Sequence, residues 1–417
     1  MTTPARRPDR RPVRLAVVVS HPIQYFCPQH ASWAALDGVG LRVFFASRDG
    51  LDAYHDPEFD RPVLWDGLAL DFPHEFLAGA EHRHVTGALD APALAHRLAA
   101  FRPDCLCVHG YAQPLARRAI AWARTAGAPV LMVGDSELRR TRPRARRAVK
   151  ALLLPRILNR VDRFLTVGDA NEAYYRRYGV PDERFVRSGF PIDVTLYDRV
   201  LGTRASARAA VRDEHGIPDH HQVLLMVGKL VAWKRQKDLV AFSNHVRRLR
   251  DDVTIVLAGA GPDEQRLRNL AARHGPGGVV FAGFVPPAAL PRYYCAADLY
   301  VHCAAVDAHS LAVTEAVYCG LPAVVSDRCG SYGPTDDVQT ELNGRVYRCG
   351  DVGALASAVI GVLDSTPARR RAMAAASARI GRGVQRLAHG QALLQALDSL
   401  ALWPEASRPA DRTSAAS

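Results

Sequence analysis

Residues 299–327 read LYVHCAAVDAHSLAVTEAVYCGLPAVVSD, and this stretch decides the fold class. LYVHC and LPAVVSD are short apolar runs typical of buried strands. LAVTEAVYC lies between them, has the spacing of a helix and is followed by Gly320, a residue type that commonly ends helices. A strand, a helix and a second strand in this order form the repeating unit of a parallel sheet, so the stretch predicts an α/β fold.

The same alternation of apolar runs and amphipathic stretches continues on both sides of this unit. Further strands are expected at residues 14–20, 41–46, 105–108, 130–134 and 163–167 in the first half, and at 223–227, 254–258 and 279–282 in the second. A polar interruption near residues 195–222 separates the two sets. The sequence therefore predicts two Rossmann-like, doubly wound domains that face each other across a ligand-binding cleft.

We expect six segments along the chain. They are a flexible basic N-terminus over residues 1–12, an N-terminal domain over 13–195, an interdomain linker over 196–222, a C-terminal domain over 223–380, a C-terminal helix over 381–403 that is placed to pack back on the N-terminal domain, and a tail over 404–417. The tail, PEASRPADRTSAAS, is expected to be disordered because it is polar and has no apolar pattern.

The charge balance and the cysteines limit the possible classes of protein. The 417 residues include 54 lysines and arginines against 42 aspartates and glutamates, which gives a net charge of +12. This excess predicts an anionic partner: a phosphate-bearing ligand, a nucleic acid or an acidic membrane surface. The eight cysteines form no C-x-x-C pair, which favours reduced thiols in the cytoplasm over a metal site or a disulfide framework. No apolar run approaches the length of a transmembrane helix, about 18 residues.

Asp307 and Glu315 are eight residues apart across the strand-to-helix turn of the opening stretch. Between them, the backbone N–H groups of Ser310, Leu311 and Ala312 are expected to open a helix N-terminus, which favours a phosphate. The spacing fits a ligand with a central phosphate and hydroxyl groups on either side. It fits a helix cap beside an unrelated surface glutamate equally well.

Two more turns carry residue types suited to phosphates. VGKLVAWKRQKDL places Lys229 and Lys234 five residues apart after Gly228, and two ammonium groups at a strand end can neutralise a diphosphate. A solvated basic turn has the same pattern. LAGAGPDEQRLRNL places Gly259 and Gly261 at the next strand end. The third glycine of the dinucleotide fingerprint is absent, so a tight strand-to-helix turn is the favoured interpretation of these two glycines.

Taken in order, these motifs resemble the C-terminal half of the family 4 retaining glycosyltransferases, which have the GT-B fold. VGKLVAWKRQKDL resembles the family's donor-diphosphate turn, LAGAGPDEQRL its Gly-x-Gly-Pro turn, and DAHSLAVTE its E-x7-E motif. FAGFVPPAALPRYYCAADLYVHCA, with Phe284 and Val285, is similar to the stretch beside the nucleotide base. SHPIQYF, VHGYAQP, VGDSELRR and VGDANEAYYRRYGVPDERF resemble a subgroup whose N-terminal domain opens with Ser-His-Pro-Ile-Gln-Tyr.

The resemblance implies transfer of a hexose from a UDP- or GDP-type donor to an acceptor hydroxyl, with retention at the anomeric carbon. The acceptor would be a glycan, a lipid-linked oligosaccharide or a small metabolite, and no metal or other cofactor would be needed. Lys229, Lys234 and the N–H groups near Leu311 would stabilise the leaving diphosphate. Glu315 would bind the ribose hydroxyls, and Asp307 would contact hydroxyls of the donor sugar.

The chain departs from the family pattern around the first acid. Asp307 stands where the family has Glu, so its side chain is one methylene shorter. Ser310 replaces the usual Gly, and His309 occupies a position often taken by an aromatic residue. We expect the helix N-terminus to survive these changes and the contacts with the donor sugar to be altered.

The N-terminal half supplies further candidates. His109 ends the apolar run CLCVHG, and the resemblance places it in the cleft near the donor sugar, although a histidine at a strand end is more often structural. Asp135 and Ser136 end another strand, where they either contact the acceptor or cap a helix. The loop after the first strand supplies three acceptor-side candidates: His21, Gln24 and Tyr25.

The segment Arg139–Lys150, RRTRPRARRAVK, contains seven positive residues and no negative one. Together with the apolar ALLLPRIL after it, the segment is typical of a basic amphipathic helix. Docking to an anionic membrane, on its inner face and beside a lipid-linked acceptor, and a solvated helix face are both compatible with this pattern. Nucleic acid is not expected as the partner, because no aromatic residues alternate with the arginines.

Other hypotheses stay open. A sugar-nucleotide 2-epimerase of related fold would release a free sugar nucleotide without any acceptor. A phosphorylase would need a lysine-bound pyridoxal phosphate or a phosphate cradle, of which the sequence gives no sign. A catalytically degenerate glycosyltransferase is suggested by Asp307 and Ser310. A basic nucleic-acid-binding protein would bind DNA with a steep salt dependence.

Overall fold

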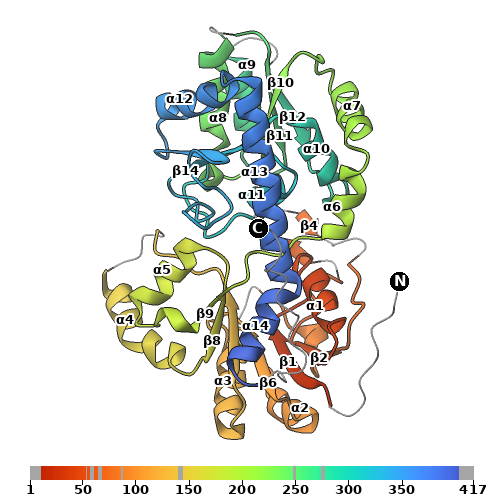
Figure 1. The fold of residues 1–417 in the computed structure, drawn as a ribbon, viewed down its shortest axis with the longest axis vertical. Coiled ribbons are helices and arrows are strands. Elements are labelled where there is room, and N and C mark those ends of the chain that lie inside the picture. Colours follow the sequence, from red (N-terminus) through yellow and green to blue (C-terminus); the bar gives the residue numbers. More distant parts are fainter. Residues whose placement is uncertain are drawn as a thin grey trace, which may run out of the picture.

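The chain forms two parallel sheets, one from each half, which are stacked along the long axis of the molecule (Figure 1). The structure is a computed structural model. It describes residues 11–52, 54–56, 61–63, 68–85, 88–139, 144–247, 250–273 and 278–402. Most of the expected N-terminal extension, all of the expected C-terminal tail and residues 140–143 of the basic segment lie outside the described residues.

The N-terminal sheet has seven strands in the order β5-β2-β1-β6-β7-β8-β9, all parallel. The strands are β1 (Val13–Val19), β2 (Val39–Phe45), β5 (His74–Phe76), β6 (Cys105–His109), β7 (Val130–Gly134), β8 (Arg163–Thr166) and β9 (Phe185–Arg187). A separate antiparallel pair consists of β3 (Tyr54–Asp56) and β4 (Arg61–Val63).

Alternate residues of β1 face two different cores, which explains why its sequence is apolar throughout. Ala16 and Val18 face a core that includes helices α2 (Leu94–Phe101), α3 (Pro114–Ala126), α4 (Arg144–Leu158) and α5 (Asp169–Arg177). Leu15 and Val17 face a second core, which includes α1 (Phe26–Ala34) and the C-terminal helix α14 (Ala392–Ser399). The sheet is therefore buried on both faces.

The C-terminal sheet has six parallel strands in the order β12-β11-β10-β13-β14-β15. They are β10 (Gln222–Val227), β11 (Val253–Ala258), β12 (Val279–Gly283), β13 (Leu299–His302), β14 (Ala323–Ser326) and β15 (Gly344–Tyr347). One face is covered by α7 (Arg204–Glu214), α10 (Leu290–Ala296) and α11 (Leu311–Tyr318). The other is covered by α8 (Gln236–Arg247), α9 (Glu264–Ala272) and α12 (Val352–Leu363).

The segment expected to be a linker, residues 196–222, differs from that expectation. Most of it belongs to two helices, α6 (Val194–Leu201) and α7, and α7 packs against α10 of the C-terminal domain. Val211 on α7 is buried in that domain's core, and the Arg212 guanidinium pairs with Asp298 at 3.2 Å. Apolar residues spaced for a helix face therefore attach this polar stretch to the C-terminal domain.

The last described helices return to the N-terminal domain. Helix α13 (Pro367–Arg386) packs against α11, and a π-turn over Leu387–Gln391 connects it to α14. Gly390 within that turn has φ 159°, a conformation that favours glycine. Figure 1 shows α13 running down the upper domain toward the lower one, with α14 beside β8 of the lower one.

Candidate active site

A cavity of about 530 Å³ lies between the two domains. Its walls include fourteen of the residues singled out from the sequence: His21, Gln24, Tyr25, Gly228, Lys229, Lys234, Gly259, Phe284, Val285, Asp307, Ser310, Leu311, Ala312 and Glu315. The first three come from the loop after β1, and the others come from loops and helix starts of the C-terminal domain. Gly261, His309, His109, Asp135 and Ser136 do not line this cavity.

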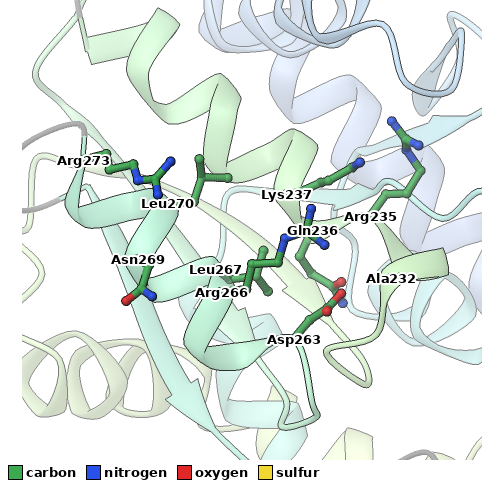
Figure 2. A pocket seen from close by; sticks show the side chains of 10 residues that line it. All are labelled: Ala232, Arg235, Gln236, Lys237, Asp263, Arg266, Leu267, Asn269, Leu270 and Arg273. Carbon is green, nitrogen blue, oxygen red and sulfur yellow. The ribbon is translucent and has the colours of Figure 1, made fainter.

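A second cavity of about 440 Å³ is separate from the first and lies between α8 and α9 (Figure 2). Lys237 comes from α8, and Arg266 and Arg273 come from α9. Asp263, just before α9, is its one acidic lining residue. Because this cavity contains none of the predicted site residues, substitutions of its side chains are suitable controls for substitutions in the first cavity.

Lys234 and Asp307 meet inside the interdomain cavity. Lys234 lies in a 3-10 turn, Ala232–Lys234, and its Nζ atom is 2.6 Å from Asp307 Oδ2. His302, at the end of β13, donates from Nε2 to the same oxygen at 2.8 Å. The side chains of Lys234 and Asp307 are 14% and 13% exposed, whereas that of His302 is completely buried. A ligand in the cavity can therefore reach the Lys234–Asp307 pair but not His302.

The neighbours of Asp307 keep it ionised. Burial alone would raise the pKa of the Asp307 carboxyl, but the hydrogen bond from His302 and the charge of Lys234 outweigh burial and hold the pKa well below its usual range. Burial lowers the pKa of His302, and its bond to Asp307 only partly offsets this. The cluster thus combines an ammonium, a carboxylate and a neutral imidazole.

Glu315 lies within α11, after the start of the helix, whereas Asp307 lies in the loop before it. Glu315 is 8% exposed, and its carboxylate accepts a hydrogen bond from Tyr294 Oη at 2.6 Å. Burial raises the pKa of Glu315 to about 7, and the tyrosine hydroxyls around it only partly offset this rise. The charge of Glu315 therefore changes near neutral pH.

The start of α11 supplies backbone donors to the cavity. Leu311 and Ala312 are its first two helical residues, so their N–H groups have no partner within the helix. The N–H of Ser310 differs from the expectation, because it donates to Ser331 Oγ at 2.7 Å and is not available to a ligand. Two of the three predicted backbone donors remain, and the partial positive charge of the helix N-terminus acts in the same direction.

Gly259 and Gly261 allow the turn after β11 to pack closely against the turn after β10. A Cβ atom at Gly259 would lie 2.0 Å from the Gly228 carbonyl oxygen, and one at Gly261 would lie 2.5 Å from the Leu230 oxygen. Gly259 lines the cavity. Gly261 has φ 157° and lies at the contact between its own turn and the turn that contains Leu230. This placement of Gly261 agrees with a tight strand-to-helix turn.

His309, predicted to bind the donor, points away from the cavity. Its side chain is 1% exposed, and its Nε2 atom lies 3.0 Å from Asp337 Oδ2. Its ring stacks on Phe190 with 5.5 Å between centroids. Burial alone would lower the pKa of His309, but Asp337 and the nearby Asp336 raise it to about 9. These three residues also form a group of possible cation ligands among the described residues, and a metal ion there would have to displace the imidazole proton.

The N-terminal candidates divide into two groups. His109 ends β6 and packs edge-on against Phe26, and its Nε2 atom has no hydrogen-bond partner among the described residues. Burial lowers the pKa of His109 to about 3, so the ring is neutral. Asp135 is exposed at the end of β7, and its electrostatic interactions with Asp307 and His309 place it near the cleft. The backbone carbonyl of Ser136 accepts a hydrogen bond from Asn171.

The sequence reasoning missed several residues that hold the site together. His302 sits in an apolar strand pattern, Asp336 and Asp337 resemble a solvated acidic turn, and Ser331 follows a glycine in a loop. The partners of Asp336, Asp337 and Ser331 are distant in the sequence and are brought close only by folding. Ser310 and Ser331, for example, are 21 positions apart. The one local signal was His302, a polar residue inside the run LYVHC, which otherwise reads as a buried strand.

Comparison with known families covers both domains. Residues 21–189 match the Glycosyl transferase 4-like domain, and residues 207–379 match Glycosyl transferases group 1. The two matches follow each other in the order of the two sheets and together span most of the chain. Each half of the chain therefore matches a glycosyltransferase family model, and the two domains have the GT-B architecture.

Curated relatives are similar over part of their length. A GDP-mannose-dependent alpha-(1-6)-phosphatidylinositol monomannoside mannosyltransferase of Mycolicibacterium smegmatis is 33% identical over 41% of this chain and 45% of its own. A 2-deoxystreptamine N-acetyl-D-glucosaminyltransferase of Streptomyces fradiae is 27% identical over 45% of this chain and 46% of its own. The chain thus matches less than half the length of each of these relatives.

Solved structures match over nearly the whole chain. Anabaena Alr3699/HepE in complex with UDP has a TM-score of 0.68 and 18% identity, and the match covers 93% of this chain and 99% of that one. A glycosyltransferase from Rickettsia africae has a TM-score of 0.68 and 12% identity, over 94% and 99%. At these identities the likeness establishes the two-domain fold alone.

Proposed function

We propose that this protein is a retaining glycosyltransferase that transfers a hexose from a UDP- or GDP-sugar to an acceptor hydroxyl. The observation that carries the proposal is the Lys234–Asp307 pair beside the start of α11, inside a cavity with walls from both domains. An ammonium group and free N–H groups in a partly dehydrated cleft stabilise the charge that develops on a leaving diphosphate. The curated relatives named for GDP-mannose and the solved neighbour with UDP support a donor of this class.

In this proposal, several residues that line the cavity are each assigned to a part of the donor. Lys229, Lys234 and the α11 N–H groups receive the diphosphate, and Phe284 and Val285 lie beside the base. Glu315 accepts hydrogen bonds from the ribose hydroxyls, and Asp307 accepts one from the donor sugar. The acceptor oxygen attacks the anomeric carbon from the face on which the diphosphate leaves, so the configuration is retained. The bond to the phosphate oxygen breaks, and that oxygen takes the acceptor's proton.

The donor half of the proposal is tested by thermal shift with UDP, GDP, dTDP, ADP, CMP and NAD. A ligand that binds only the folded state raises the melting midpoint by mass action. We expect one nucleoside diphosphate to raise it, Lys234→Ala to abolish that shift, and the control Lys237→Ala in the second cavity to keep it. A shift that survives Lys234→Ala would overturn the assignment of Lys234, and the absence of any shift would favour a degenerate enzyme.

On the acceptor side, we propose that the protein docks on an anionic membrane through α4, at the inner face. Val149, Leu152 and Leu153 lie on one face of α4 and are 58%, 63% and 51% exposed, and Leu138 just before the basic run is 48% exposed. An outward apolar row within an arginine-rich segment fits the boundary between lipid headgroups and acyl chains. Lys150 departs from the expected pattern, because its ammonium lies 4.7 Å from the centre of the Tyr174 ring.

Two further findings are compatible with this placement. In the part of the chain that the structure describes, no helix is long and apolar enough to cross a bilayer. All eight cysteines are free thiols, which suits the reducing environment on the cytoplasmic side.

Vesicle flotation tests the docking surface. We expect binding to phosphatidylglycerol-containing vesicles, weaker binding to neutral phosphatidylcholine vesicles, and loss of binding in Leu152→Ser/Leu153→Ser. Leu342→Ser is the control, because Leu342 is 40% exposed but lies in the C-terminal domain. Equal binding of the double variant and the wild type would contradict docking through α4, and so would a failure of the wild type to bind anionic vesicles.

A further inference from the structure

One loop of the C-terminal domain, between β14 and β15, is bonded to the start of α5 in the N-terminal domain. Asp169, the first residue of α5, accepts hydrogen bonds from the Thr335 backbone N–H at 3.0 Å and from the Thr335 hydroxyl at 2.6 Å. The Asp169 N–H in turn donates to Asp336 Oδ2 at 2.8 Å. Arg187 on β9 pairs with Asp169 at 2.7 Å and donates to the Thr335 carbonyl at 3.2 Å. Charged groups of both domains therefore bond reciprocally at this contact.

Two glycines, one on each domain, make this approach possible. A Cβ atom at Gly168 would lie 2.4 Å from Asp336 Oδ2, and one at Gly333 would lie 2.1 Å from Asp169 Oδ2. Gly168 has φ −178°, an extended conformation that any residue adopts. Gly333 is not among the glycines with positive φ. At both positions, therefore, the carboxylate of the other domain excludes a side chain, and the backbone conformation does not.

The same loop also supports the start of α11. Asp337 Oδ2 accepts a hydrogen bond from Thr314 Oγ1 at 2.6 Å and lies 3.0 Å from His309 Nε2. His309 directly precedes Ser310, the N-cap residue of α11. The side chains of His309 and Asp337 are no more than 2% exposed, so water cannot take over these bonds without a rearrangement. A displacement of the loop would be transmitted to the turn that presents the Leu311 and Ala312 N–H groups.

We propose that Asp169, Thr335 and Asp336 form an interdomain latch, and that Asp337 and His309 are positioning residues that link the latch to the first turn of α11. With the latch closed, this turn is held where it faces the cleft. With the latch open, the turn loses its support and binds a diphosphate less well. The link to diphosphate binding rests on the proposed function, whereas the latch between the domains does not.

The glycines give a sharp test, because Gly168→Ala and Gly333→Ala insert one methyl group into the latch and remove no polar group. The control is Gly40→Ala, whose Cβ would have its nearest neighbour at an ordinary 3.6 Å. Small-angle X-ray scattering without ligand measures domain opening, and calorimetric titration with UDP and GDP measures affinity. We expect a larger radius of gyration and roughly tenfold weaker nucleotide binding in both latch variants, the size of one lost charge-assisted hydrogen bond, and wild-type values in the control.

A double variant separates the latch from a general loss of packing. Asp336→Ala should open the domains as Gly168→Ala does, and combining the two should add little, because both break the same contact. Additive effects would contradict the latch, and so would wild-type scattering from both glycine variants. If the alanine variants do not fold, Thr335→Val removes only an exposed hydroxyl and must still enlarge the radius of gyration. If the wild type binds neither nucleotide, the proposed function fails while the scattering still decides on the latch.

Discussion

Two clusters of charged side chains flank the start of α11, and they differ mainly in their access to water. The cleft cluster consists of Lys234, Asp307 and His302, and the interdomain cluster consists of His309, Asp336 and Asp337. The Lys234 and Asp307 side chains are 14% and 13% exposed on a cavity wall, whereas those of the interdomain cluster are 1–2% exposed. The first arrangement can exchange its bonds for those of a ligand, and the second can only hold structure in place.

The two histidines show the same difference in their charge. The neutral His302 shares a single carboxylate with Lys234, so burial dominates and lowers its pKa. The ring of His309 lies near two carboxylates, and these raise its pKa to about 9 despite burial. The two histidines therefore differ in charge, because His302 bonds to one carboxylate that it shares with Lys234 whereas His309 has two carboxylates beside it.

The largest expected effect is on turnover when Asp307 is changed. Asp307→Asn keeps the shape but loses the charge that holds Lys234 in the cavity. We expect release of nucleoside diphosphate from the donor to fall roughly 10²-fold, as when a preorganised transition-state contact is removed. Asp263→Asn in the second cavity is the matched control. Turnover within twofold of the wild type would show that the cleft cluster does not act on the donor.

Removing the corresponding acid of the interdomain cluster should affect stability instead. Asp337→Ala leaves a buried imidazolium with one carboxylate fewer, and Thr314 loses its 2.6 Å acceptor and keeps only the Ser310 carbonyl at 3.4 Å. We expect the free energy of unfolding in urea to fall by about 3 kcal/mol. Asp307→Asn should lower it by less than this, because Lys234 lines the cavity and water there can solvate its ammonium once the carboxylate charge is lost. Equal losses in the free energy of unfolding for the two variants would contradict a structural role for the interdomain cluster that the cleft cluster lacks.

The raised pKa of His309 predicts a pH dependence with a defined sign. The folded state holds the His309 proton more tightly than the unfolded state, so its contribution is complete below the ordinary value of 6.5 and is lost as the pH rises through about 9. Wild type should exceed His309→Gln in stability near pH 6 by on the order of 2 kcal/mol, and the gap should narrow above pH 9. Charged neighbours facing this ring are Asp336 and Asp337 in the latch loop, Asp307 in its own loop and Asp135 across the cleft. A gap that stays constant with pH would refute this assignment.

The smallest effect is expected at Glu315, whose pKa is raised to about 7. Its uncharged form is favoured in the folded state, so its contribution is complete below the ordinary value of 4.5 and is lost as the pH rises through 7. Glu315→Gln should therefore be more stable than the wild type at pH 8, by on the order of 1 kcal/mol, and not at pH 5. Melting curves at the two pH values measure this difference, and a difference that does not change between them would contradict burial as the cause.

Much of the fold could be predicted from the sequence, because strands buried on both faces leave a continuous apolar run. The expected strand at 130–134 coincides with β7, and 163–167 differs from β8 by one residue. The edge strands β5, β9 and β15 were missed because each is three or four residues long and carries polar side chains. The helices over 194–214 were missed because polar and charged residues interrupt their apolar positions, although the apolar faces pack on α10.

The site could be predicted only as far as it depends on local geometry. A strand, a turn and a helix place Asp307, Leu311 and Glu315 within one short segment, so their spacing was informative. The partners of His309 are 27 and 28 residues further along, and Asp169 comes from the other domain. No local pattern shows that His309 turns away from the cleft, because that depends on where Asp336 and Asp337 return.

The most direct test of the cleft assignment is a crystal structure with the nucleoside diphosphate that gives the largest thermal shift. We expect the diphosphate in the interdomain cavity, within hydrogen-bond distance of Lys234 Nζ and of the Leu311 or Ala312 N–H, with the ribose at Glu315. The His309–Asp337 bond should be unchanged. A nucleotide in the cavity between α8 and α9, or one in the cleft that contacts neither Lys234 nor the start of α11, would contradict the assignment of the donor site.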